Sequence, residues 1–143
     1  MGTRRNGREA AIKILYTTDI TAETEFEKLI GEYFTENPSK SDTMQFCTTL
    51  AMGVLNNKVM IDATLEETLK NWDLDRLGYM ERAILRLGYY EISQSLDTPN
   101  AVIIDEAIEL AKIYCGPDSA KLVNATLDRL SNQGNGTKQR PTI

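Results

Sequence analysis

The 143-residue sequence contains no histidine, and this absence excludes several kinds of functional site. A Ser–His–Asp triad, a Cys–His dyad, a His-ligated zinc site and the carboxylate–histidine pattern of a di-iron helix bundle all need an imidazole ring. The nine glycines form neither a G-x-G-x-x-G loop nor a Walker-type loop. Nucleotide hydrolysis and dinucleotide chemistry therefore have no support in the sequence, and we expect neither a metal nor a cofactor.

Cysteine is almost as scarce, with Cys47 and Cys115 far apart and outside any C-x-x-C motif. Two such residues are typical of small buried side chains in a reducing compartment, so we expect a cytoplasmic protein. No apolar run is long enough to cross a bilayer, and the arginine-rich start is not followed by the apolar stretch of a signal peptide. Neither a membrane span nor a signal peptide is predicted.

Hydrophobic residues make up 41% and charged residues 26% of the chain, the proportions of an ordinary folded domain. Apolar side chains recur with a helical period in nearly every long segment, and no convincing strand alternation is present. We predict an all-α fold, a compact bundle of about seven helices over residues 1–132, and a disordered tail over residues 133–143. The expected helices cover roughly residues 4–18, 22–36 and 41–54, with a break or continuation near 56–57 before a fourth helix that carries Ile61, Leu65 and Leu69. The last three are expected at roughly 78–93, 100–114 and 118–131. Trp72 is expected to anchor the connector before the fifth helix to the core.

Positive charge is concentrated at the start of a chain whose formal net charge is -5. Residues 1–13 hold four cationic side chains and one carboxylate, a net of +3, which leaves -8 for the remainder. The four are Arg4, Arg5, Arg8 and Lys13, and the arginines are expected to project from the first helix beyond the acidic body. A local basic patch of this kind can bind a polyanion in spite of the negative global charge.

The fifth predicted helix has a polar face that a simple core does not explain. At 100° per residue, Arg82, Arg86, Tyr89 and Tyr90 lie opposite the apolar side, and Leu85 lies near the edge. Arginine and tyrosine are enriched at protein interfaces, but a solvated helix face would show the same pattern. Glu91 falls on the inner side, where we expect a structural pairing with backbone N–H groups or with an arginine of another helix.

The turn between the last two helices carries two residues with alternative interpretations. Asp118 is suited to cap the seventh helix, although a helix N-terminus also attracts phosphate. Tyr114 covers the core at the end of its helix or offers a stacking face to an unpaired base. Asp105 and Glu106 are adjacent and diverge by about 100°, so they cannot flank one bond as a catalytic pair, and they are interpreted as part of a solvated face.

Four blocks of the sequence together resemble the NusB family of transcription antitermination factors. They are "RRNGREAAIKILY", "LAMGVLNNKVMID", "WDLDRLGYMERAILRLGYYEI" and "PNAVIIDEAIELAKIYCGPDSAKLVNATLDRL", which lie in this order within residues 4–130. The resemblance implies an all-helical protein that is not an enzyme. It implies binding of a single-stranded RNA element called boxA, as a heterodimer with the ribosomal protein NusE. The complex would join elongating RNA polymerase and suppress premature termination in ribosomal RNA transcription.

The resemblance also implies which residues form the two surfaces. The RNA-binding residues would be Arg4, Arg5, Arg8, Tyr16, Tyr114, Asp118 and Lys121. The residues facing NusE would be Glu81, Ile84, Leu85, Arg86 and Tyr90 on the fifth helix. Gly7 stands where the family often has alanine, and a glycine there is expected to weaken the start of the first helix.

Other functions stay open at this point. NusB-like domains also occur at the N-terminus of certain RNA cytosine methyltransferases, so the chain is alternatively a regulatory module that works with such an enzyme or in ribosome assembly. A helical adaptor whose arginines only decorate the surface is a further alternative. Some relatives self-associate, and the sequence does not decide between a monomer and a homodimer.

Overall fold

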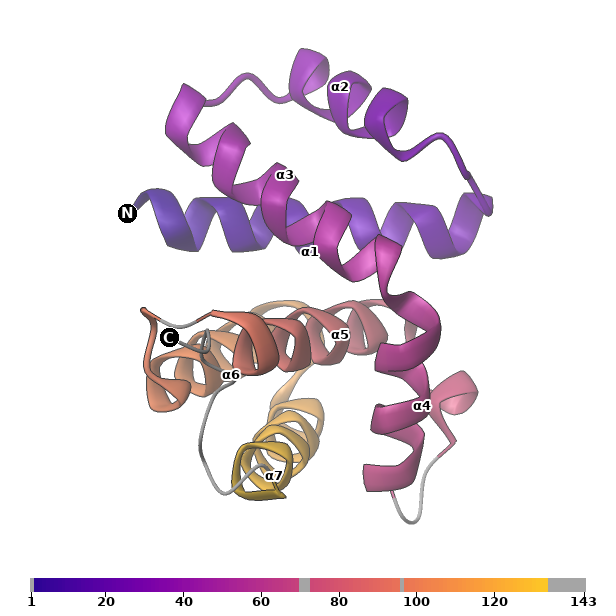
Figure 1. Ribbon diagram of the computed structural model, residues 1–143, viewed down its shortest axis with the longest axis vertical. Coiled ribbons are helices and arrows are strands. Elements are labelled where there is room, and N and C mark those ends of the chain that lie inside the picture. Colours follow the sequence, from indigo (N-terminus) through magenta and orange to yellow (C-terminus); the bar gives the residue numbers. More distant parts are fainter. Residues whose placement is uncertain (1, 70–72, 96, 134–143) are drawn as a thin grey trace, which may run out of the picture.

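In the computed structural model, the predicted all-α fold is confirmed over the described residues, which are 2–69, 73–95 and 97–133. This part of the chain forms seven α-helices and one short 3₁₀ turn, with no strand (Figure 1). The elements are α1 (Thr3–Thr21), α2 (Phe26–Glu36), α3 (Ser41–Asn56), α4 (Lys58–Thr68), η1 (Leu74–Arg76), α5 (Tyr79–Gln94), α6 (Asn100–Tyr114) and α7 (Pro117–Gln133). The predictions for Trp72 and for the tail from residue 134 lie outside the described residues.

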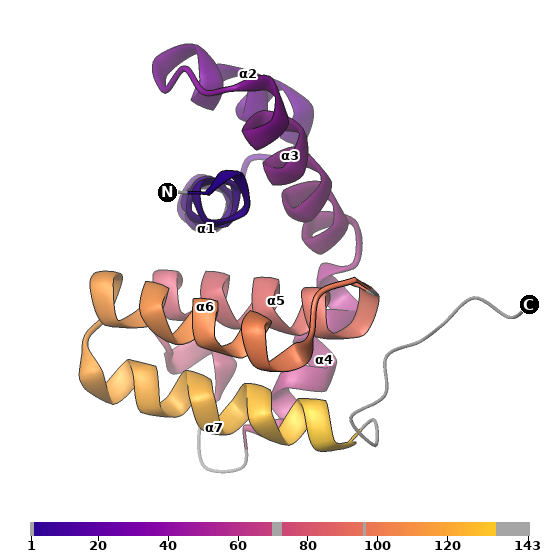
Figure 2. The ribbon, with the colours of Figure 1, turned by 90° about the vertical axis from the view of Figure 1, so that its left-hand side faces the viewer.

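Two groups of helices pack on each other through α1 and α5. Helices α1, α2 and α3 form one group, helices α4 to α7 form the other, and α1 packs along both α3 and α5 (Figures 1 and 2). Helix α5 is central, because it contacts α1, α3, α4, α6 and α7. Residues 83–88 are consequently all buried, on every side of the helix.

Helix α1 owes its position to an apolar stripe and to one small residue. Ala11, Ile14 and Leu15 are buried, as their spacing predicts. Gly7 lies inside the helix, where an added Cβ would come within 2.6 Å of the Phe46 ring on α3. The expectation that Gly7 weakens the start of the helix misses this contact, because the glycine lets α1 and α3 approach closely.

Two short breaks determine how the later helices turn. The chain breaks rather than continues between α3 and α4, where the Asn57 side-chain amide donates to the Gly53 carbonyl at 2.7 Å. Between α6 and α7, Gly116 adopts a φ of 109°, a left-handed conformation that favours glycine. Helix α7 begins at Pro117, so Asp118 lies inside its first turn and does not cap it as predicted. No helix among residues 2–69, 73–95 and 97–133 is long and apolar enough to cross a bilayer.

Candidate nucleic-acid interface

Arg4 and Arg5 lie at the accessible start of α1, and each is paired with an acidic residue of the opposite helix group. The Arg5 guanidinium donates twice to Glu106, at 3.0 and 2.7 Å, and its side chain is still 40% exposed. The hydrogen bond and charge of Glu106 raise the pKa of Arg5, and the pKa of Glu106 is lowered in return. Arg4 donates to Thr98 at 3.0 Å and lies 3.5 Å from the Asp97 carboxylate. Both arginines are therefore accessible to solvent yet already compensated by carboxylates.

Arg8 does not project from the helix, and the expectation that it does is wrong. Its guanidinium makes a bidentate pair with the Glu91 carboxylate, with both distances 2.8 Å, and both side chains are buried. Burial by itself lowers the pKa of Arg8, but the hydrogen bond and charge of Glu91 outweigh it and the pKa is raised. The inward Glu91 thus has the structural arginine partner that its position predicts. Arg8 faces α5 because it is one turn before Ile12 and two turns before Leu15 on the buried side of α1.

Tyr114, at the end of α6, docks on Glu9 and Lys13, which are half-buried on one side of α1. Its hydroxyl donates a short hydrogen bond to the Glu9 carboxylate, and the Lys13 ammonium lies 5.7 Å from its ring centroid. Burial and the contact with Glu9 raise the pKa of Tyr114 to about 12, so the phenol keeps its proton at neutral pH. The tyrosine is half-buried. Its ring therefore covers part of the helix and also remains at the surface.

The remaining predicted RNA-binding residues lie on the same side of the molecule. Tyr16 is exposed on α1 and meets Tyr79 of α5 edge to face, with 6.3 Å between ring centroids. The Ser119 hydroxyl donates to Glu81, which holds the first turn of α7 beside the first turn of α5. Asp118, in that first turn of α7, and Lys121, directly after it, are both exposed. In Figure 2, α1 is seen end-on with its start toward the viewer, and the α6–α7 turn lies at the left of the picture. The fold therefore gathers Arg5, Tyr16, Tyr114, Asp118 and Lys121 onto one face, although they come from three helices.

The predicted protein-binding face of α5 is not a free surface. Ile84, Leu85 and Arg86 are buried in this chain, which corrects both their assignment as contact residues and the interpretation of Arg86 as part of an exposed face. The physical reason is the central position of α5, which has neighbours on all sides. Of the five predicted residues, Glu81 and Tyr90 alone are partly exposed. Tyr90 packs on Gly53, where an added Cβ would come within 2.2 Å of the Tyr90 ring.

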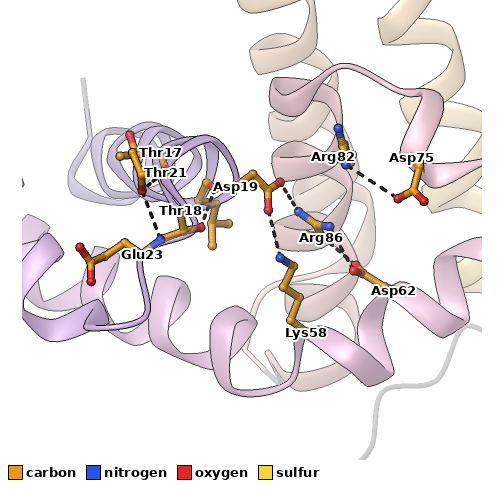
Figure 3. A network of polar contacts seen from close by, with 11 residues as sticks. Thr17, Thr18, Asp19, Thr21, Glu23, Lys58, Asp62, Asp75, Arg82 and Arg86 are labelled. Atoms are coloured by element: carbon orange, nitrogen blue, oxygen red, sulfur yellow. Dashed lines mark hydrogen bonds and ion pairs between the residues drawn. The ribbon is translucent and has the colours of Figure 1, made fainter.

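Arg86 is the centre of a charge network that joins three helices (Figure 3). Its guanidinium donates to Asp19 of α1 at 2.6 Å and to both carboxylate oxygens of Asp62 of α4, at 2.8 and 3.0 Å. Lys58 also donates to Asp19, at 3.0 Å. Burial by itself lowers the pKa of Arg86, but the hydrogen bonds and charges of Asp62 and Asp19 outweigh it. The net pKa is raised, so the residue stays charged. Periodicity within one helix gives no signal for such a network, because its members are brought together by packing.

Comparison with known proteins identifies the relatives of this fold. The model of the NusB family matches residues 5–132. The chain belongs to the NusB family. Over 143 residues and the full length of both chains, it is 41% identical to the transcription antitermination protein NusB of Helicobacter pylori strain J99.

Solved structures agree with this assignment. A T. maritima NusB structure superimposes with a TM-score of 0.82 at 35% identity, covering 91% of each chain. A structure of the antitermination factors NusB and NusE in complex with double-stranded RNA matches with a TM-score of 0.84 at 28% identity, covering 93% of this chain and 98% of the other. NusB family members thus include one that is solved together with NusE and RNA.

The sequence of this NusB family chain did not reveal two features of its surface, an ion pair and a groove. Glu106, interpreted as part of a solvated face, is the partner of Arg5. A groove of about 660 Å³ also lies between the first half of α1 and the α2–α3 turn, and it was not predicted. The charge count of residues 1–13 includes two of its lining residues, Lys13 and Glu9. The lining combines residues of α1 with residues of the α2–α3 region, which is distant in sequence, so no local pattern marks the groove.

Proposed function

We propose that this chain is a non-catalytic, cytoplasmic transcription antitermination factor. It binds boxA-type single-stranded RNA as a heterodimer with NusE and joins elongating RNA polymerase to suppress premature termination of ribosomal RNA transcription. The observation that carries the proposal is the face that unites Arg5, Tyr16, Tyr114 and Lys121. Cationic and aromatic side chains occur together there on an otherwise acidic protein, and this combination suits phosphates and unpaired bases. The kinship with NusB proteins supports it.

The residues of this face have different roles in the proposal. Arg4, Arg5 and Lys121 attract phosphates, while Tyr16 and Tyr114 offer ring faces to bases. Asp118 is exposed near Lys121 at the start of α7, and we assign it a contact to a base or ribose donor. Arg8 acts indirectly, because its buried pair with Glu91 holds α1 against α5.

The partner protein needs a different surface from the buried part of α5. Val59 and Met60, at the start of α4, are 87% and 65% exposed, although both are apolar. Single exposed apolar side chains are common on protein surfaces, but two adjacent ones form a small apolar patch, which a partner protein can cover. We propose that NusE docks here, beside the Arg86 network that fixes α4 against α1. Met60→Glu is then expected to weaken NusE association, whereas Glu66→Lys, an exposed change further along α4, is the matched control.

The decisive experiment is a titration of boxA RNA into the protein at two salt concentrations, with and without NusE. Single-stranded binding is expected to weaken with a logarithmic salt slope of about -0.7 for each phosphate neutralised. Arg5→Ala and Lys121→Ala should each weaken binding, while Lys28→Ala, on the exposed side of α2, should not.

The outcomes separate this function from its alternatives. Binding of NusE without measurable RNA affinity in the heterodimer would favour a helical adaptor instead. Methyl transfer to RNA from S-adenosylmethionine would favour a methyltransferase-associated module. A duplex of the same RNA is included because a relative was solved with double-stranded RNA, and equal binding of both forms would contradict single-strand recognition.

A further inference from the structure

The groove beside α1 is a hollow with polar walls. It lies between the first half of α1 and the segment that joins α2 to α3, and its volume of about 660 Å³ is in the range of small-ligand sites. Its lining includes Asn6, Lys13, Tyr33, Ser39 and Lys40. Hydroxyl, amide and ammonium groups therefore face the space together with one aromatic side chain.

The charges of the groove favour an anionic occupant. Lys13 and Lys40 contribute two positive charges, and Glu9 is the one acidic residue in the lining. The Glu9 carboxylate is already engaged, because it accepts the hydrogen bond from Tyr114. On a chain with a net charge of -5, a hollow with a local excess of positive charge is suited to a phosphate.

The groove is continuous with the proposed RNA-binding face. Lys13 and Glu9 line the groove, and both also contact Tyr114, at the edge of that face. A strand that passes over Tyr114 would thus meet the mouth of the groove next. A base that leaves the stack needs hydrogen-bond partners for its edge and an apolar contact for its ring, and the Tyr33 and Ser39 side chains offer both kinds of group.

We propose that this groove is a subsite for one unstacked nucleotide of the same single-stranded RNA, with its phosphate held by Lys13 and Lys40. The inference rests on the proposed RNA-binding function and adds a place where the strand leaves the α1–α6–α7 face. An extended peptide is a less suitable occupant, because the two lysines and the hydroxyl-lined wall offer little apolar surface.

The test combines a charge reversal, a steric block and an altered RNA. Lys40→Glu is compared with Lys28→Glu, which makes the same change on the exposed side of α2, away from the groove lining. If Lys40 contacts a phosphate, its variant loses affinity and the salt slope becomes shallower by about 0.7. Ser39→Trp fills the groove without a change of charge and is expected to lower affinity roughly fivefold or more, the effect of losing one stacked base.

An abasic nucleotide moved along the boxA RNA identifies the base concerned. At one position it should weaken binding to the wild-type protein, and at that position Ser39→Trp should cause no further loss. Residues 39 and 40 are exposed in a turn, so substitutions there should leave the fold intact, and thermal unfolding of the variants checks this. Lys40→Ala is a second, milder variant that removes the charge without reversing it. The subsite is refuted if the Lys40 variants bind like Lys28→Glu and Ser39→Trp binds like wild type, while Arg5→Ala still loses affinity. Absence of RNA binding by wild-type protein, with or without NusE, overturns the proposed function itself.

Discussion

Replacing Arg8 with alanine would leave the Glu91 carboxylate without its partner inside the protein. The two side chains are 5% and 3% exposed and are joined by two hydrogen bonds of 2.8 Å, so water cannot readily replace the lost guanidinium. Breaking a buried ion pair by removing one member typically costs about 3–5 kcal/mol. A domain of ordinary stability, about 5–15 kcal/mol, would lose a large share of its free energy of unfolding.

Chemical denaturation followed by circular dichroism measures this loss directly. We expect the denaturant concentration at the unfolding midpoint to be lower for Arg8→Ala than for wild type. In thermal unfolding, we expect the melting temperature to decrease by roughly 10–20 °C. Arg4→Ala is the matched control, since its pair with Asp97 is largely exposed and its removal should change stability by less than about 1 kcal/mol.

A double replacement distinguishes an unpaired charge from a lost contact. Arg8→Met combined with Glu91→Leu removes both charges and keeps the volume, so this variant should regain most of the stability. If Arg8→Ala costs less than about 1 kcal/mol, or if the double variant is as unstable as the single one, the argument from the buried pair is wrong. RNA affinity of Arg8 variants is meaningful only where they are folded.

Three further predictions concern other charged or titratable groups. Glu106→Gln frees Arg5 from its carboxylate and should raise RNA affinity about two- to fivefold at low salt; unchanged affinity would mean that Arg5 does not contact RNA. Burial raises the pKa of Asp19, but Lys58 and Arg86 lower it more, so the net value is below the usual 3.8. The ionised Asp19 carboxylate therefore stabilises the fold above pH 3.8, and this stabilisation is lost as the pH falls through the lower pKa of the folded state. The difference in stability between wild type and Asp19→Asn should then shrink in denaturation curves taken at successively lower pH. Burial raises the pKa of the Cys47 thiol to about 12, so iodoacetamide should modify the partly exposed Cys115 first, and denaturant should abolish the difference seen by mass spectrometry.

Helix α1 illustrates how far periodicity reaches. The spacing of Ala11, Ile14 and Leu15 predicts the buried stripe of the helix, and the structure confirms it. The same spacing places Arg8 near that stripe, but the cluster of charges at the chain start led to the expectation that all three arginines project. Composition describes a segment as a whole, whereas burial is decided residue by residue by what packs against each side.

Helix α5 shows where single-helix reasoning fails. A helical wheel assumes one buried and one exposed side, which holds for a helix at the surface of a bundle. Helix α5 contacts five other helices, so its polar side is partly covered as well. Arg86 is buried and neutralised by Asp19 and Asp62, while the other predicted polar residues of this side are half-buried. Neither carboxylate is near Arg86 in sequence, and no pattern within residues 78–93 could have indicated them.

The sequence by itself determined the all-α class, the approximate helices and the basic start of an acidic chain, because these depend on the order of residues within short segments. The family relationship was also readable from sequence blocks. Tertiary structure alone decided which of the arginines are accessible to solvent, which carboxylates compensate them and where a groove opens beside α1. Those properties depend on distances between residues such as Arg5 and Glu106, and only the packing of helices remote in sequence determines such distances.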